Sequence, residues 1–137
     1  PSGCTQFFLG VSGSFETYNY NNAQGMQLAN QQYGICIRQE AGFCGIQYST
    51  CPDEVNTMDL AFSVSGNGTI VAPVSAVGSA SCAEDWVSIP CASDVKRSIT
   101  QSNDTPCEDR ICGTAFASTS NAADPTTVYS KWVNCTQ

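Results

Sequence analysis

Apolar and polar residues alternate with a period of two along much of the chain, which is the pattern of half-buried β-strands. The clearest runs are residues 33–39, 43–49, 58–65, 85–89 and 127–133. Turn-forming residues separate such runs about every ten residues, and no segment shows sustained helical periodicity. The pattern therefore predicts an all-β sandwich or barrel without an internal repeat.

Two regions near the N-terminus allow more detailed predictions. Residues 4–20 are predicted to form two short strands, which Gly10 and Gly13 separate. Residues 33–50 are predicted to form a hairpin with its turn at 39–42, where a glycine is available for a positive φ angle.

The aromatic residues divide into two groups by their place in these runs. We expect four of them in the core: Phe7, Phe43, Phe62 and Trp86. Three tyrosines are instead candidates for lining a binding face: Tyr18, Tyr20 and Tyr33.

Charge and composition exclude several classes of function. The net charge is −7 and only five residues are basic, so we expect neither a nucleic acid nor an anionic membrane surface as partner. No apolar run approaches the roughly 20 residues of a membrane-spanning helix, and we expect no membrane insertion. Histidine is absent, which excludes Ser-His-Asp and Cys-His catalysis. The acidic clusters at 53–54, 84–85 and 104–109 are interpreted as solvated side chains beside turns, so we do not expect an enzyme.

Nine cysteines in 137 residues are the strongest compositional feature. No two of them have the two-residue spacing of a zinc knuckle, so the sequence favours a disulfide framework and a secreted protein. Cys82 and Cys112 enclose Cys91 and Cys107. We interpret this nested arrangement as two strands joined by a loop that two disulfides staple.

The pairing of the other five cysteines stays open: Cys4, Cys36, Cys44, Cys51 and Cys135. Because the total is odd, at least one cysteine is free, pairs between chains, or has its partner in a missing segment. Alternation in the predicted hairpin places Cys36 and Cys44 on opposite faces, which argues against a bridge between these two.

Three Asn-x-Ser/Thr sequons support an extracellular, glycosylated protein: Asn67, Asn103 and Asn134. The polar loop at residues 92–106, called the clamped loop below, contains Lys96 and Arg97, which are the only adjacent basic pair. The loop is either a solvated connection or a recognition element for a partner.

Several of these motifs resemble a CUB domain. In the first half, Cys4, the run Ser12-Gly13-x-Phe15 and the run Tyr33-x-Ile35-x-Ile37 resemble the opening cysteine and strands of that family. In the second half, Cys82-Ala83-Glu84-Asp85 resembles its "C.yD" element, and Asp109-Arg110-Ile111-Cys112-Gly113 resembles its "gr.CG" element. The sequence looks most like those of the CUB domains of uncharacterised secreted proteins of arthropods.

The resemblance implies a two-sheet antiparallel, jelly-roll-like sandwich. Residues 1–137 would be a single CUB-like domain whose closing strands are truncated or divergent. Cys82–Cys112 would be the family's second disulfide, and Cys91–Cys107 would be an added bridge across the clamped loop. Truncation would leave an edge strand open, so edge-strand pairing with a partner is a further expectation. An inter-chain disulfide through the odd cysteine is another.

Many CUB domains bind calcium through a glutamate, the aspartate of the "C.yD" element and a later aspartate. Asp85 matches the middle ligand, but Val77 occupies the glutamate position and the later aspartate has no clear counterpart. We therefore expect no cofactor and no metal, and a calcium site would be a degenerate one that keeps Asp85 alone.

The family also implies a non-catalytic extracellular role in binding a protein or a glycan. The chain would then be part of a larger secreted protein or assembly. The alternative is a secreted protease inhibitor that presents the clamped loop, with Lys96 and Arg97 suited to a trypsin-like enzyme. A clamped loop is preorganised, which lowers the ordering cost of binding.

Overall fold

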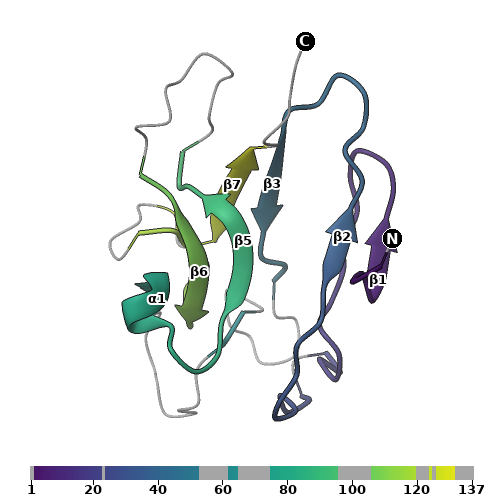
Figure 1. The fold of residues 1–137 in the computed structure, drawn as a ribbon. Coiled ribbons are helices and arrows are strands. Elements are labelled where there is room, and N and C mark those ends of the chain that lie inside the picture. Colours follow the sequence, from purple (N-terminus) through teal and green to yellow (C-terminus); the bar gives the residue numbers. More distant parts are fainter. Residues whose placement is uncertain are drawn as a thin grey trace.

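The computed structural model describes residues 2–22, 24–52, 62–64, 75–95, 106–119, 124 and 126–131. Within these residues it contains seven strands and one helical turn (Figure 1). In chain order they are β1 (Gln6–Phe8), β2 (Ile35–Ile37), β3 (Gly45–Ser49), β4 (Ser75–Val77), α1 (Gly78–Ser81), β5 (Val87–Ala92), β6 (Glu108–Gly113) and β7 (Thr127–Lys131). The described part of the chain is thus all-β apart from α1, which confirms the predicted fold class.

Two antiparallel sheets form a disulfide-stapled sandwich. Three strands make the first sheet in the order β4–β6–β5, and β3 pairs with β7 in the second. A bridge between Ser93 and Tyr129 joins the end of β5 to β7 through N–H···O bonds of 2.9 and 2.8 Å. An irregularity in register between Ser88 and Ala92 bends β5, whose curvature is visible in Figure 1.

The buried core is built from the inward-facing residues of β5, β6 and β7 and from the segment after β6. Five residues form it: Ile89, Ala92, Ile111, Phe116 and Val128. The ring of Phe62 packs against that of Phe116 with a centroid distance of 5.0 Å, so the expected core contact of Phe62 is confirmed. Fully burying one large apolar side chain contributes about 1.5–3 kcal/mol, so this cluster makes a large contribution to the stability of the sandwich.

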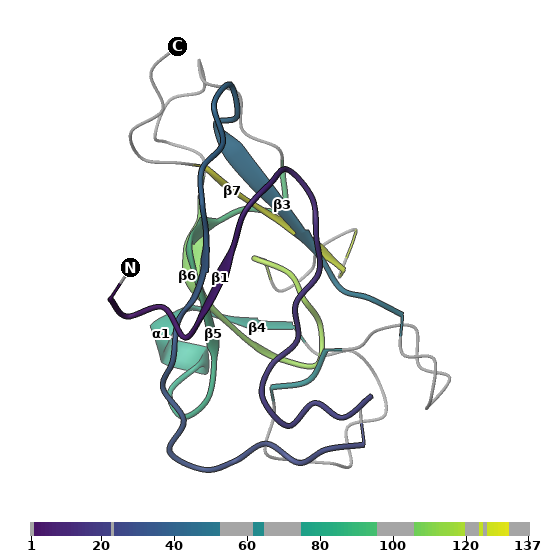
Figure 2. The same ribbon diagram turned by 90° about the vertical axis from the view of Figure 1, so that its right-hand side faces the viewer.

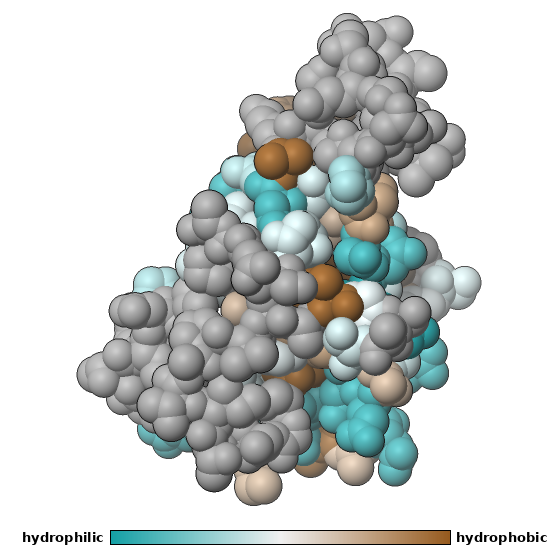
Figure 3. All heavy atoms as spheres, turned by 90° about the vertical axis from the view of Figure 1, so that its left-hand side faces the viewer, coloured by the Kyte–Doolittle hydropathy of each residue, from teal (hydrophilic) through white to brown (hydrophobic). Residues whose placement is uncertain are grey.

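The N-terminal third of the chain lies outside this core. β1 pairs with β2 in parallel, with Phe7 opposite Cys36, and the Cys4–Cys36 disulfide links the two segments. Neither strand contacts another described strand, and no described residue from 2 to 52 is buried. Figure 2 shows β1 and the loops beside it running over the side that faces the viewer. On the opposite side, where α1 lies, hydrophilic residues predominate among those coloured in Figure 3.

The prediction that residues 33–50 form a hairpin is wrong. Both of its strands exist, but β2 pairs with β1 and β3 pairs with β7. The connection does contain the expected turn, in which Gly42 has a φ of 83° and the Phe43 N–H donates to the Glu40 carbonyl at 3.1 Å. Alternation identifies a strand but not its partner, because it reports only which face is buried.

The second strand predicted within residues 4–20 is also absent, since β1 is the only strand there. Asn19, Asn21 and Asn22 adopt left-handed φ angles of 64°, 45° and 52°. Asparagine tolerates this region better than most side chains, so the asparagine-rich segment forms turns instead of a strand. A Cβ atom at Gly25 would lie 1.5 Å from the Asn19 carbonyl oxygen, and the loop therefore closes only with glycine at that position.

Three of the four aromatic residues expected in the core are exposed instead. Phe7, Phe43 and Trp86 have 45%, 50% and 38% of their surface accessible. Phe7 and Phe43 lie before β3, in a segment of the chain in which no described residue is buried. Trp86 precedes β5 directly and lies against Arg110, so its ring stays at the surface.

Candidate functional site

Two disulfides hold the β5–β6 hairpin, one at each end. Cys82–Cys112 joins the residue after α1 to β6, and Cys91–Cys107 joins β5 to the residue before β6. These are the two pairs that the nested cysteine spacing suggested. The bridges turn the hairpin into a frame whose ends can present side chains in fixed positions.

The structure resolves part of the pairing of the other five cysteines. Cys4 pairs with Cys36, and Cys44 is disulfide-bonded as well. Cys51, two residues after β3, is free and exposed. Cys135 lies outside the described residues. Cys51 is therefore the unpaired thiol within the part of the chain that the structure describes.

At the Cys82 end of the hairpin, Arg110 fixes the position of Trp86. The guanidinium carbon of Arg110 lies 4.0 Å from the centre of the Trp86 ring, which is a cation–π contact. Its Nη1 also donates to the Cys82 carbonyl oxygen at 3.1 Å. One side chain of β6 thus ties the segment from Cys82 to Trp86 to the sheet, while part of the indole ring faces solvent.

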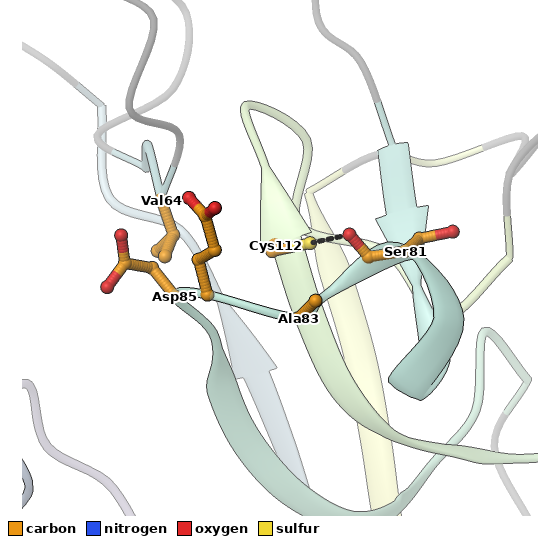
Figure 4. Close-up of a pocket in the computed structure, with 6 residues that line it drawn as sticks. Val64, Ser81, Ala83, Asp85 and Cys112 are labelled. Carbon is orange, nitrogen blue, oxygen red and sulfur yellow. Dashed lines mark hydrogen bonds between the residues drawn. The ribbon is translucent and has the colours of Figure 1, made fainter.

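A shallow pocket of about 300 Å³ lies beside this segment (Figure 4). Its lining comes from the turn before β5 and from neighbouring elements: Val64, Ser81, Ala83, Glu84, Asp85 and Cys112. In Figure 4 the Asp85 side chain extends on the side of Val64, whereas the sulfur of Cys112 faces Ser81. That sulfur is 3.7 Å from the Ser81 carbonyl oxygen, but it is bonded to Cys82 and has no proton to donate. The pocket rim is acidic, which suits contact with hydrogen-bond donors of a ligand.

The residues around Asp85 do not fit the ligand set of calcium-binding CUB domains. Val77, at the glutamate position, ends β4 as a half-buried side chain without an oxygen. Among the residues that the structure describes, no group of three or more His, Cys, Asp or Glu side chains could hold a metal ion. Asp85 and its neighbour Glu84 are surface acids of this fold.

The other end of the hairpin anchors the base of the clamped loop. The Cys91 N–H donates to Asp109 Oδ1 at 2.7 Å, although Cys91 has a left-handed φ of 49°. Asp94 accepts hydrogen bonds from the N–H and the hydroxyl of Ser118, both at 2.7 Å, and from the hydroxyl of Thr119. Two carboxylates and a disulfide therefore fix the residues at which the loop leaves the sheet.

Several predicted site residues lie outside the described part of the chain. They are the basic pair Lys96 and Arg97, the sequon asparagines Asn67, Asn103 and Asn134, and Cys135. The predictions for these positions stay predictions.

Large exposed apolar side chains gather on the N-terminal third, not around the hairpin. Eight of the ten in the described chain lie there and are called the N-terminal apolar surface: Phe7, Leu9, Val11, Phe15, Tyr18, Met26, Leu28 and Phe43. Tyr18 packs against Tyr33 at a ring-centroid distance of 4.9 Å, and its N–H donates to the Tyr33 hydroxyl at 3.2 Å. The sequence pointed to a binding face only through its tyrosines, Tyr18 among them, and did not predict the other exposed side chains. A second signal existed, since residues 17–37 contain no charged residue.

Two carboxyl groups outside the pocket are stabilised in their ionised form. The pKa of Glu40 is lowered because Glu40 accepts the Gly10 N–H at 2.9 Å and pairs with Arg38 at 3.0 Å. The pKa of Asp124 is lowered by hydrogen bonds from the hydroxyl and the N–H of Thr126. Glu40 links the turn after β2 to the segment after β1, and Asp124 stabilises a local turn, so the electrostatics of both groups serve the fold.

Comparison with protein families identifies the chain. The model of the animal CUB domain matches residues 1–134, and the chain belongs to that family. Domains of this family are generally extracellular, non-catalytic binding modules. Comparisons with curated proteins and with solved structures find no match. No helix within the described residues is long and apolar enough to cross a membrane. The resemblance to a CUB domain is confirmed, and the narrower likeness to arthropod secreted proteins stays a prediction.

Proposed function

We propose that this CUB domain is a non-catalytic extracellular interaction module that binds a protein or glycan through the Trp86 end of the β5–β6 hairpin. The general role of the family supports the binding function. The observation that carries the proposal is the exposed Trp86 ring, held by Arg110 next to the Cys82–Cys112 bridge. A large aromatic side chain that stays at the surface in a fixed position is a natural anchor for a ligand.

The surroundings of Trp86 indicate the chemistry of the ligand. Glu84 and Asp85 line the adjacent pocket and offer hydrogen-bond acceptors. Basic side chains of a protein and hydroxyl groups of a sugar both donate to carboxylates, and both have apolar surface that packs on an indole ring. Because Trp86 is already positioned in the free domain, little side-chain entropy is lost on binding.

A binding screen with matched variants tests this proposal. The purified chain is incubated with a panel of extracellular proteins and with a glycan array, alongside Trp86→Ala and Val95→Ala. Val95 is a suitable control because it is also exposed but follows β5, at the other end of the hairpin. We expect a ligand whose affinity falls at least about tenfold in Trp86→Ala and is unchanged in Val95→Ala. Hydrolysis of panel members, or a ligand that Trp86→Ala binds normally, would contradict the proposal.

We also infer that the protein is secreted and glycosylated, as one CUB-like domain (residues 1–137) of a larger protein or assembly. The disulfides support an oxidising compartment. The sequons at Asn67, Asn103 and Asn134 support glycan attachment. Intact-mass measurement of protein secreted from eukaryotic cells, before and after enzymatic deglycosylation, tests the inference. A mass that enzymatic deglycosylation leaves unchanged would refute the inference that the protein is glycosylated.

Inhibition of a trypsin-like protease by the clamped loop is a second candidate function. The anchored base favours it, because Asp109 and Asp94 hold the residues from which the loop departs. Residual activity of trypsin-like enzymes is measured with micromolar amounts of the chain and of a Lys96→Ala/Arg97→Ala variant. Inhibition that the variant loses would support this function, and the absence of inhibition by the wild type would eliminate it.

A further inference from the structure

We propose that the N-terminal apolar surface is the interface through which two copies of this chain associate. The described residues from 2 to 52 include none that is buried, yet they display eight large exposed apolar side chains. A concentration of large exposed apolar side chains is typical of a surface that another molecule covers. This interface is separate from the Trp86 end of the hairpin, so it is tested independently of the proposed function.

The side chains of this surface belong to one folded unit. Gln6 Nε2 donates to the Glu16 carbonyl oxygen at 3.2 Å, which holds the segment after β1 against the strand. The rings of Phe8 and Phe15, whose centroids lie 6.0 Å apart, pack between the same two segments. The Cys4–Cys36 bridge and the tyrosine pair described above connect this segment to the residues around β2. Figure 2 shows these segments together on one side of the molecule.

The distribution of charge argues for a second copy as the occupant. Residues 1–52 contain two acids and one base, a net charge of −1, so the rest of the chain carries −6 of the total of −7. Arg38 and Glu40 pair with each other, which leaves Glu16 as the uncompensated charge of this region. Two copies can therefore meet here with little repulsion, whereas their other surfaces repel each other.

A two-fold contact also suits the chemistry of this surface. In such a dimer the same patch meets itself, so it must be self-complementary, and an apolar patch without strong charge meets that condition. Residues 18–33 supply three tyrosines with asparagine and glutamine side chains between them. Rigid amphipathic rings combined with adaptable amides are the composition of surfaces that bind proteins, because the amides satisfy hydrogen bonds at the rim.

Sedimentation velocity of the purified chain, up to about 200 µM, tests the proposal over a range in which a micromolar dimer is populated. All proteins carry Cys51→Ser, because a disulfide through the exposed thiol would otherwise also give dimers. Leu28→Glu is compared with Val95→Glu, since the two side chains are 52% and 51% exposed and only Leu28 belongs to the surface. Both variants add one negative charge, so general repulsion cancels in the comparison.

We expect a reversible dimer that Leu28→Glu weakens at least about tenfold, because the dimer would bury an unpaired charge. Val95→Glu should leave the dissociation constant unchanged. Met26→Glu, at a side chain that is 80% exposed, should act like Leu28→Glu and replaces it if that variant fails to fold by circular dichroism. Added salt should leave the dimer unchanged or strengthen it, since it screens the repulsion between two acidic chains.

Three outcomes would overturn the proposal. The first is a chain that stays monomeric over the whole concentration range. The second is a dimer that Leu28→Glu and Val95→Glu weaken equally, which would place the interface elsewhere. The third is an association that salt weakens, because that interface would consist of ion pairs.

Discussion

Replacing Arg110 with alanine should lower the free energy of unfolding by about 2–3 kcal/mol, because this side chain makes two contacts at the Cys82 end of the hairpin. A cation–π contact at an exposed site contributes about 0.5–1 kcal/mol, and the guanidinium lies 4.0 Å from the Trp86 ring. A hydrogen bond from a charged donor contributes about 1.5–3 kcal/mol. The bond to the Cys82 carbonyl is 3.1 Å long and only partly buried, so the lower half of that range applies.

Urea unfolding followed by far-UV circular dichroism measures this change, since Trp86 is part of the perturbed contact and is unsuitable as a fluorescence reporter. A double-mutant cycle with Trp86→Leu isolates the cation–π contact, for which we expect a coupling of about 0.5–1 kcal/mol. Arg110→Lys keeps the charge but loses the planar guanidinium, so its stability should lie between those of the wild type and Arg110→Ala. A loss below about 0.5 kcal/mol for Arg110→Ala, the size of an ordinary surface substitution, would refute the reasoning.

Three further predictions concern other parts of the molecule. Removing the Cys91–Cys107 bridge by a double alanine substitution opens a ring of sequence separation 16 and should cost about 3 kcal/mol in the same urea assay, whereas a cost below about 1 kcal/mol would contradict it. Because the pKa of Glu40 is lowered, its contact with the Gly10 N–H is fully present at the ordinary glutamate pKa and above, and it is lost only as the pH falls further, through the lowered pKa of the folded state. The chemical shift of this amide proton, followed by NMR from about pH 6 to about pH 2, should therefore move in the acid part of the range, and a shift that stays constant would argue against the contact. Of the nine cysteines, six form the three described bridges, Cys44 is bonded and Cys51 is free, which leaves Cys135 as the partner of Cys44. Non-reducing peptide mapping should therefore find Cys44 joined to Cys135, and a bridge between Cys44 and Cys51 would contradict this prediction.

Alternation along the chain predicted the strands better than their partners. The strands within residues 33–39 and 43–49 are present as β2 and β3, because an apolar face needs a surface to cover it wherever the strand pairs. Their partners are β1 and β7, one of them at the other end of the sequence, and no local pattern carries that information. The nested bridges of the β5–β6 hairpin were accessible to sequence reasoning because both pairs lie within one supersecondary unit.

The candidate site was less accessible for the same reason. Asp85 was a candidate because it belongs to the "C.yD" element, whereas Trp86 was expected in the core because large aromatic side chains usually lie there. Its exposure depends on Arg110, which comes from another strand and reaches both the ring and the Cys82 carbonyl. A contact between two strands depends on their register, and the register follows from the tertiary fold.

The pairing of β3 with β7 has a consequence for how the chain is made. Ser49 and Thr127 lie opposite each other although 78 residues separate them, so the second sheet forms only after most of the chain has been synthesised. Until then four thiols of the early segment are present together: Cys4, Cys36, Cys44 and Cys51. Four thiols can pair in three ways, and the strand that positions β3 does not yet exist to select among them. Uncatalysed rearrangement of wrong bridges takes minutes to hours, so a catalyst of thiol–disulfide exchange would shorten the maturation of this protein.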